Sequence, residues 1–260
     1  MTNSLKGKRI LVTRPAGQAE NLCQLIEKQD GIAVRFPTLE ITEARPNPEL
    51  LAAASQSDWL IFTSTNAVDF AIKAFNGKMA EFKQPRLAAV GQATAQALSN
   101  AGYLVNCVPA SEFNSEGLLA ELAMQQVSGM NCVIVRGIGG RDKLEQGLSQ
   151  RGAKVTYLEV YQRSQPDNDN KTVIDQLLTG QLDAITITSS ESLQNLILML
   201  TNQALPALQN TLLVSASERI ASLAKQLGFK RIAVSQQPTD AAILQTLTTL
   251  YNGENSGRRN

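Results

Sequence analysis

Polar residues collect at six places where an apolar run ends, and their types suit the binding of anions. The six segments are Thr13-Arg14, Thr63-Ser64-Thr65-Asn66, Gly91-Gln92-Ala93-Thr94, Arg136-Gly137, Thr188-Ser189-Ser190 and Ser215-Ala216-Ser217. Each precedes a predicted helix. Serine and threonine there cap the helix start, whose free N–H groups attract anions. Capping alone explains any single segment. Together the six favour a ligand with several anionic groups, held largely by backbone amides.

Two arginines and one tyrosine add chemistry to these segments. Arg14 and Arg136 each follow an apolar run, and each guanidinium can fork onto a carboxylate. A structural ion pair at the strand end is an equal alternative. Tyr161, in Leu-Glu-Val-Tyr-Gln-Arg, is a further candidate. The glycines that begin at Gly137 do not fit the dinucleotide fingerprint, and the chain has no phosphate-binding P-loop motif.

The composition excludes several other classes of site. The 24 basic and 23 acidic residues are too balanced for a nucleic-acid surface, and histidine is absent. Catalytic triads and metal sites that need histidine are therefore excluded. Cys23, Cys107 and Cys132 are far apart, so we expect buried thiols in a reducing cytoplasm and no metal site. No signal segment and no membrane span are predicted, because residues 1–9 are polar and polar residues interrupt the uncharged stretch 192–217.

The elements that must position these residues are predicted by ten short apolar runs. The runs cover residues 10–13, 33–36, 59–62, 87–90, 104–108, 132–135, 155–157, 184–187, 212–214 and 232–234. Continuous apolar runs are typical of strands buried on both faces, as in parallel sheets. The segments between them have helical spacing. Together they predict an α/β protein.

An internal repeat assigns five strands to each of two domains. Residues 10–41 resemble residues 132–160, so that Arg14 matches Arg136, and residues 58–64 resemble 183–189. The repeat leaves the domain boundary open. One interpretation cuts the chain near residue 128 into two contiguous halves. The other exchanges the first strand-helix-strand block between the domains.

A series of motifs along the chain resembles one known family. The motifs are Ile10-Leu11-Val12-Thr13-Arg14-Pro15, Phe62-Thr63-Ser64-Thr65-Asn66-Ala67-Val68, Ala89-Val90-Gly91-Gln92-Ala93-Thr94-Ala95, Val160-Tyr161-Gln162-Arg163 and Ser217-Glu218-Arg219-Ile220-Ala221. In this order and spacing they resemble the uroporphyrinogen-III synthase family, the cyclising enzymes of haem and sirohaem synthesis. Each motif alone is weak, whereas the series is fairly specific.

The resemblance implies two flavodoxin-like domains, each a five-stranded parallel sheet flanked by helices. It selects the exchanged boundary. Residues 1–36 and 165–251 would form domain 1, and residues 40–160 would form domain 2. Residues 37–39 and 161–164 would form a two-stranded hinge. We expect the polar segment 252–260 to be disordered.

The family implies a lyase reaction in the cleft between the two domains. The substrate is hydroxymethylbilane, a linear tetrapyrrole with an acetate and a propionate on each pyrrole. The enzyme removes water, inverts the terminal pyrrole through a spiro intermediate and closes uroporphyrinogen III without metal or organic cofactor. The family points to Tyr161 as the catalytic acid, since a phenol keeps its proton at neutral pH.

Substrate binding is expected from ten further residues at the strand ends. Ser64, Thr94, Ser189 and, on a looser alignment, Ser217 carry over from the family's polar contacts. The strand-end positions themselves add Arg14, Thr63, Gly91, Arg136, Gly137 and Ser190. We expect a cytoplasmic monomer with no nucleic-acid or membrane partner. Two alternatives stay open: a two-lobed small-molecule-binding or sensor protein that uses the same cleft, and a relative that keeps the fold without activity.

Overall fold

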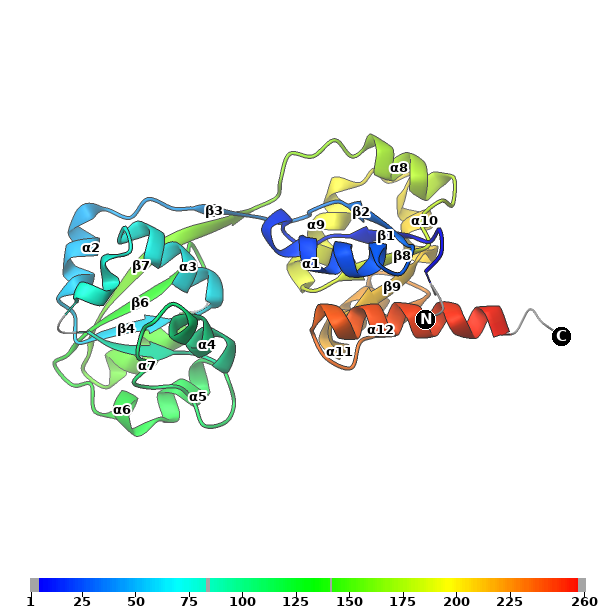
Figure 1. The fold of residues 1–260 in the computed structure, drawn as a ribbon. Coiled ribbons are helices and arrows are strands. Elements are labelled where there is room, and N and C mark those ends of the chain that lie inside the picture. Colours follow the sequence, from blue (N-terminus) through cyan, green and yellow to red (C-terminus); the bar gives the residue numbers. More distant parts are fainter. Residues whose placement is uncertain (1–4, 83–84, 141, 257–260) are drawn as a thin grey trace. The chain divides into compact units, whose positions relative to one another are not determined.

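The computed structural model describes residues 5–82, 85–140 and 142–256, and the chain divides into two compact units (Figure 1). Unit 1 comprises Met1–Glu40 and Ser164–Asn260, and unit 2 comprises Ile41–Arg163. The first strand-helix-strand block therefore groups with the C-terminal part of the chain. The chain passes from one unit to the other twice, after Glu40 and after Arg163.

Unit 1 is built on a five-stranded parallel sheet with the strand order β10-β9-β8-β1-β2. The strands are β1 (Arg9–Val12), β2 (Ile32–Arg35), β8 (Ala184–Ile187), β9 (Leu212–Ser215) and β10 (Ile232–Val234). Strands β8 and β9 are buried throughout, and β1 is buried except at its first residue. This burial explains why their sequences are continuous apolar runs.

Six helices flank the described part of this sheet. They are α1 (Ala16–Glu27), α8 (Lys171–Leu178), α9 (Ser190–Met199), α10 (Leu205–Asn210), α11 (Glu218–Gln226) and α12 (Asp240–Ser256). Helix α1 runs beside α12, and α9 packs against α11 (Figure 1). The buried side of α1 consists of Ala19, Leu22, Cys23 and Ile26, spaced three or four residues apart as on one face of a helix.

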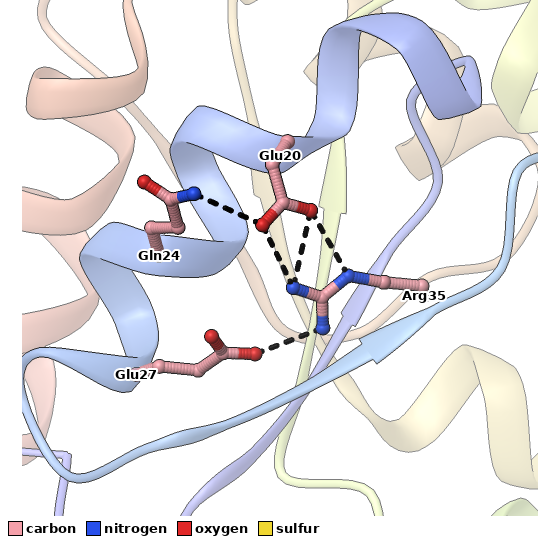
Figure 2. A network of polar contacts seen from close by, with 4 residues as sticks. All are labelled: Glu20, Gln24, Glu27 and Arg35. Atoms are coloured by element: carbon pink, nitrogen blue, oxygen red, sulfur yellow. Dashed lines mark hydrogen bonds and ion pairs between the residues drawn. The ribbon is translucent and has the colours of Figure 1, made fainter.

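The edge strand β2 is fastened to α1 by a charged network. Arg35 donates to Glu27 at 2.8 Å and to Glu20 at 3.3 to 3.4 Å, and Gln24 donates to Glu20 at 3.1 Å (Figure 2). The hydrogen bond from Gln24 and then the Arg35 guanidinium lower the pKa of the Glu20 carboxyl. Charged side chains along an exposed edge also discourage its pairing with a second chain.

Unit 2 contains a second five-stranded sheet, with the order β3-β7-β6-β4-β5. Its strands are β3 (Glu40–Glu43), β4 (Trp59–Phe62), β5 (Arg86–Ala89), β6 (Asn131–Gly137) and β7 (Lys154–Ser164). The pairs β4–β5, β4–β6 and β6–β7 are parallel. The helices are α2 (Pro48–Ser55), α3 (Thr65–Ala74), the 3-10 helix η1 (Lys78–Glu81), α4 (Gln92–Asn100), α5 (Ser115–Ala120), α6 (Leu122–Gln125) and α7 (Lys143–Gln150).

The structure corrects one predicted strand. Residues 104–108 form no strand, and only Cys107 makes an isolated parallel bridge to Ala88. The side chain of Asn106 accepts a hydrogen bond from the Leu87 N–H at 2.8 Å. This bond uses a backbone donor that a longer ladder would need, so pairing stops after one bridge.

The fifth strand of the sheet is instead β3, which is not an apolar run and was not predicted. Its sequence Glu-Ile-Thr-Glu is polar at both ends and only half-buried in between. It lies beside β7 at the sheet edge, and just beyond it the Ala44 N–H donates to the Val160 carbonyl at 3.0 Å. An edge strand has one partner and needs no continuous apolar run.

A β-bulge lies where β6 and β7 approach their carboxyl ends. Arg136 pairs with Glu159, but the next residue, Gly137, pairs with Tyr161, so Val160 is an extra residue in β7. Val160 and Tyr161 both join the core cluster that contains the buried residues of α3. Strict alternation would have put Tyr161 on the opposite face. The bulge therefore redirects this side chain, as bulges near functional sites commonly do.

Helix α12 extends past Asn252, where we expected the polar tail to begin. It continues to Ser256, and residues 257–260 lie outside the described residues. Ile243, Leu247 and Tyr251 anchor the helix in the unit 1 core. Once a helix is nucleated, each further residue adds a backbone hydrogen bond, so a polar end can remain helical. Among the described residues, no helix is long and apolar enough to cross a membrane.

Candidate active site

The predicted site residues lie at the carboxyl ends of strands in both units. Unit 1 holds Arg14, Ser189, Ser190 and Ser217, and unit 2 holds Thr63, Ser64, Gly91, Thr94, Arg136, Gly137 and Tyr161. This edge is where open α/β sheets bind ligands. The structure places both Ser64 and Gly137 against Tyr161 in unit 2.

Serine caps open three of the helices at these edges. In each case the serine Oγ accepts a hydrogen bond from a backbone N–H three residues later. The pairs are Ser64 with Ala67 on α3 at 3.1 Å, Ser189 with Ser192 on α9 at 3.0 Å, and Ser217 with Ile220 on α11 at 3.5 Å. A cap of this kind satisfies one N–H and leaves others at the positive end of the helix dipole for an anion.

Helix α4 has the same geometry without a capping side chain. Gly91 occupies its N-cap in an extended conformation and makes no side-chain bond. A Cβ at Gly91 would lie 3.4 Å from the Cβ of Phe113, whose side chain is 56% exposed. Phe113 is thus the residue that borders this helix start. Thr94, by contrast, is buried within α4.

The hydroxyl of Tyr161 lies against the start of α3. Its Oη is 3.1 Å from Ser64 Oγ, with either atom able to donate. Its ring stacks on Phe70 with 5.7 Å between centroids, and the residue is 3% exposed. Arg163 donates from Nη2 to Tyr161 Oη at 3.3 Å. The phenol is therefore held on three sides, and its oxygen has two polar neighbours.

Gly137 makes room for this tyrosine. A Cβ at Gly137 would lie 2.5 Å from the Cε2 atom of Tyr161 and 2.6 Å from its Cζ. Such distances are far below van der Waals contact, so only glycine admits the ring here. Gly137 therefore has a packing role, in addition to the substrate binding that its position at a strand end predicts.

The two predicted carboxylate-binding arginines are already engaged within the protein. Arg14 forms an ion pair with Asp240 at the start of α12, and Asn21 donates to the same carboxylate at 2.7 Å. Arg136 is 7% exposed and donates to the carbonyl oxygens of its own loop. Its guanidinium also lies 4.5 Å above the ring of Tyr157. Arg136 Nη1 also forms an ion pair with Asp142 Oδ1 at 3.6 Å, so each arginine has an ion pair within its own unit.

The remaining predicted hydroxyls have local partners. Thr63 donates to the Val135 carbonyl at 3.2 Å and so ties β4 to β6. Ser190 accepts a hydrogen bond from Arg219 Nη1 at 3.3 Å. Sequence reasoning did not select Arg163 or Arg219. A signal was present for Arg163, because residues two apart on a strand share a face, and Arg163 follows Tyr161 by two.

Two surface hollows are lined by other residues. One, of about 350 Å³ in unit 2, is lined by Glu43, Arg45, Tyr157 and Glu159 among others. The other, of about 450 Å³ in unit 1, includes Lys8 and lies where the strands begin. Neither contains a predicted site residue. No cluster of three or more cysteine, aspartate or glutamate side chains suited to a metal occurs within the described residues.

Comparison with known proteins identifies the family. The model of the family described as Uroporphyrinogen-III synthase HemD matches residues 20–245. Uroporphyrinogen-III synthase of Escherichia coli (strain K12) is 33% identical over 245 residues, covering 92% of this chain and 99% of its own. The Salmonella typhimurium synthase is 32% identical over 244 residues, with the same two coverages.

A solved structure gives the same result for the fold. A mutant uroporphyrinogen III synthase from the extremely thermophilic bacterium Thermus thermophilus superposes with a TM-score of 0.64 at 18% identity, covering 95% of this chain and 100% of its own. The predicted α/β class with two five-stranded sheets is confirmed. Because the family model spans most of the sequence and a 33% identical relative spans 92% of it, this chain belongs to the uroporphyrinogen-III synthase family.

Proposed function

We propose that this chain cyclises hydroxymethylbilane to uroporphyrinogen III, with loss of water and inversion of the terminal pyrrole. Family membership supports this reaction. The structural observation that carries the proposal is the hydroxyl pair of Tyr161 and Ser64, 3.1 Å apart at the start of α3. A proton donor beside a helix N-terminus suits a substrate that loses a hydroxyl and bears many carboxylates.

The reaction asks the protein for one proton and for control of geometry. The leaving hydroxyl is on a carbon attached to an electron-rich pyrrole, which pushes electrons toward the breaking C–O bond. The departing oxygen takes a proton from Tyr161 Oη and leaves as water. This step leaves a cation on the pyrrole and a phenolate on Tyr161. Ring closure then releases one proton from the attacking pyrrole carbon, and the phenolate can accept it.

Helix starts supply the binding sites for the substrate carboxylates in this proposal. The starts of α3, α4, α9 and α11 all lie at carboxyl ends of strands, and three of them carry a serine cap. Backbone N–H groups bind carboxylates without adding net charge, which fits the formal charge of +1. Arg14 and Arg136 would act indirectly, by holding the strand ends in place.

The proposed setting of the reaction is a monomer in the cytoplasm. The three cysteines are free and buried, which suits a reducing compartment. Size-exclusion chromatography with light scattering, run at micromolar concentration, tests the monomer. A mass near twice 28.1 kDa would contradict it.

A coupled assay tests the function directly. Hydroxymethylbilane is generated in situ, and the oxidised products are resolved into type I and type III isomers. The type I isomer forms spontaneously, without ring inversion. We expect the wild type to give type III at a rate above this background, and Tyr161→Phe to lose most of that rate. Only type I from the wild type would overturn the proposal and leave ligand binding without catalysis as the alternative.

Tyr157→Phe is the matched control. It removes the same atom from the same strand, but the Tyr157 hydroxyl donates to Asp142 at 3.3 Å on the other face of the sheet. We expect it to keep the wild-type rate. If Tyr161→Phe also kept the rate, Tyr161 would not be the acid, although the synthase activity would stand.

A further inference from the structure

Arg163 is placed to act on the phenol of Tyr161. Both residues lie in the last part of β7 and, being two apart, they project to the same side of the strand. Arg163 Nη2 donates to Tyr161 Oη at 3.3 Å, and the guanidinium carbon lies 5.7 Å from the ring centroid. Arg163 as a residue is exposed. A surface arginine thus directs a donor toward the oxygen of a buried phenol.

This contact has a definite direction. A guanidinium has donors and no acceptor, so the phenolic oxygen must accept the bond from Arg163. The phenolic proton then points elsewhere. Ser64 Oγ, at 3.1 Å, is one acceptor within reach, and a substrate oxygen at a similar distance would be another. Arg163 therefore favours the orientation in which Tyr161 can give its proton away.

We propose that Arg163 is a positioning residue for the acid Tyr161, an inference that rests on the proposed function. Its guanidinium orients the phenolic proton and stabilises the phenolate that forms when the C–O bond of the substrate breaks. The positive charge remains on Arg163 throughout. Tyr161 gives one proton to the leaving hydroxyl, and its phenolate takes one back from the pyrrole carbon at ring closure, so the guanidinium exchanges no proton. Because the phenolate exists only after proton transfer, the bond strengthens along the reaction and accelerates the chemical step.

Arg163→Gln tests this role in the isomer-resolved assay. A charge-assisted hydrogen bond of this kind corresponds to about a 10-fold to 100-fold loss of kcat, with KM unchanged within about twofold. Arg163→Lys keeps the positive charge but lacks the planar set of guanidinium N–H donors. Its kcat should therefore lie between those of the wild type and Arg163→Gln. Lys154→Gln, which removes an exposed charge at the other end of β7, is the control and should behave as the wild type.

A second measurement observes the contact without catalysis. The chain has four tyrosines, so protein labelled with carbon-13 at tyrosine Cζ gives four resonances, and Tyr161→Phe identifies one of them. Arg163→Gln should shift that resonance and leave the other three in place. Lys154→Gln should shift none. Normal circular dichroism and an unchanged urea midpoint for Arg163→Gln establish that the fold is intact.

The outcomes separate this proposal from the proposed function. A wild-type rate for Arg163→Gln, or an unmoved Tyr161 resonance, would overturn the role of Arg163 while the synthase activity stood. A raised KM with kcat retained would also overturn it, since Arg163 would then bind a substrate carboxylate directly. If the wild type made only type I product, the proposed function would fail, and the role of Arg163 as an aid to that acid would fail with it, even if the resonance shifted.

Discussion

Gly137 and Tyr161 face each other across the β6–β7 bulge so closely that a Cβ on Gly137 would lie 2.5 Å from the tyrosine ring. The ring also stacks on Phe70, with 5.7 Å between the two centroids. The position of the phenolic oxygen therefore depends on a residue that contributes no side chain. This relationship couples the fold of unit 2 to the proposed acid.

Gly137→Ala is expected to impair both stability and catalysis. The added methyl must displace the Tyr161 ring, and overpacking of this kind costs about 1–3 kcal/mol of unfolding free energy. Displacement moves the Tyr161 hydroxyl out of hydrogen-bonding distance of Ser64. We therefore expect the rate of type III formation to fall by about tenfold or more. Urea denaturation and the isomer-resolved assay measure the two effects.

Gly17→Ala is the control for this substitution. Gly17 is in the first turn of α1, and a Cβ there would meet no atom within 4 Å. We expect unchanged activity and a stability equal to or slightly above the wild type, because alanine favours a helix by up to about 1 kcal/mol. Wild-type stability and rate for Gly137→Ala would show that the ring is not confined as described.

Ser64→Ala should separate capping from catalysis. Ser64 caps α3 and also lies 3.1 Å from the Tyr161 hydroxyl. Loss of a cap costs about 1 kcal/mol of unfolding free energy. Asn47, which caps α2 through the Glu49 N–H at 2.9 Å, is a matched cap in the same unit with no contact to Tyr161. Asn47→Ala should lose similar stability and keep its activity.

Only Ser64→Ala is expected to lose kcat, by about tenfold, since one hydrogen bond to the phenol disappears. Steady-state kinetics at 25 °C, where both variants are folded, gives the comparison. Equal activity losses in the two variants would mean that helix capping alone accounts for the effect of Ser64.

The ion pair between Arg14 and Asp240 should support the fold instead of contacting substrate. Their side chains are 23% and 13% exposed, and they lie 226 residues apart in sequence, so the pair ties the end of β1 to α12. Breaking a fully buried pair costs 3–5 kcal/mol, and partial exposure lowers this to about 1–3 kcal/mol for Arg14→Gln or Asp240→Asn.

Kinetics on the same two variants tests the assignment. We expect KM to stay within twofold of the wild type in both. A double variant should be about as unstable as either single variant, because the interaction is lost once. A large rise in KM for Arg14→Gln, without one for Asp240→Asn, would instead make Arg14 a substrate ligand.

Much of the fold could be predicted from the sequence because buried strands and helix caps each depend on a few neighbouring residues. Residues 59–62 are a continuous apolar run, and residues 184–187 are apolar except for Thr186; they form β4 and β8, which are buried throughout. Ser64 and Ser189 could be predicted as caps because capping involves one residue and the three that follow it. The same reasoning failed at residues 104–108, where one side chain, Asn106, interrupts the ladder.

The parts of the site that could not be predicted depend on contacts between distant segments. The bulge that turns Tyr161 toward α3 arises from the register between β6 and β7, which neither strand encodes alone. The ion pair of Arg14 with Asp240 joins residues 226 positions apart in sequence, so no local pattern could predict that partner. The packing of the Tyr161 ring on Gly137 depends on the same β6–β7 register, so the sequence of β6 alone could not predict it.

Cys132 should make the fold less stable at alkaline pH. The side chain is fully buried, and burial, followed by the nearby Asp58 carboxylate, raises the pKa of its thiol to about 11. In the unfolded chain the thiol titrates near 8.5. The folded protein therefore keeps a proton that the unfolded chain loses. The contribution of the Cys132 thiol to the free energy of unfolding is complete below about pH 8.5. It is lost as the pH rises toward 11, and the loss is at most about 3 kcal/mol.

Urea denaturation at intervals from pH 7 to 10.5 measures this loss, and Cys132→Ala identifies its source. At pH 7 the free energy of unfolding of the variant should be lower than that of the wild type, because the substitution leaves a small cavity. Above pH 8.5 its free energy of unfolding should fall less steeply. Part of the fall in stability with pH should remain in the variant because of Cys23 and Cys107, since burial also raises the pKa of both thiols. Parallel curves for variant and wild type would mean that Cys132 ionises in the folded protein as readily as in the unfolded chain.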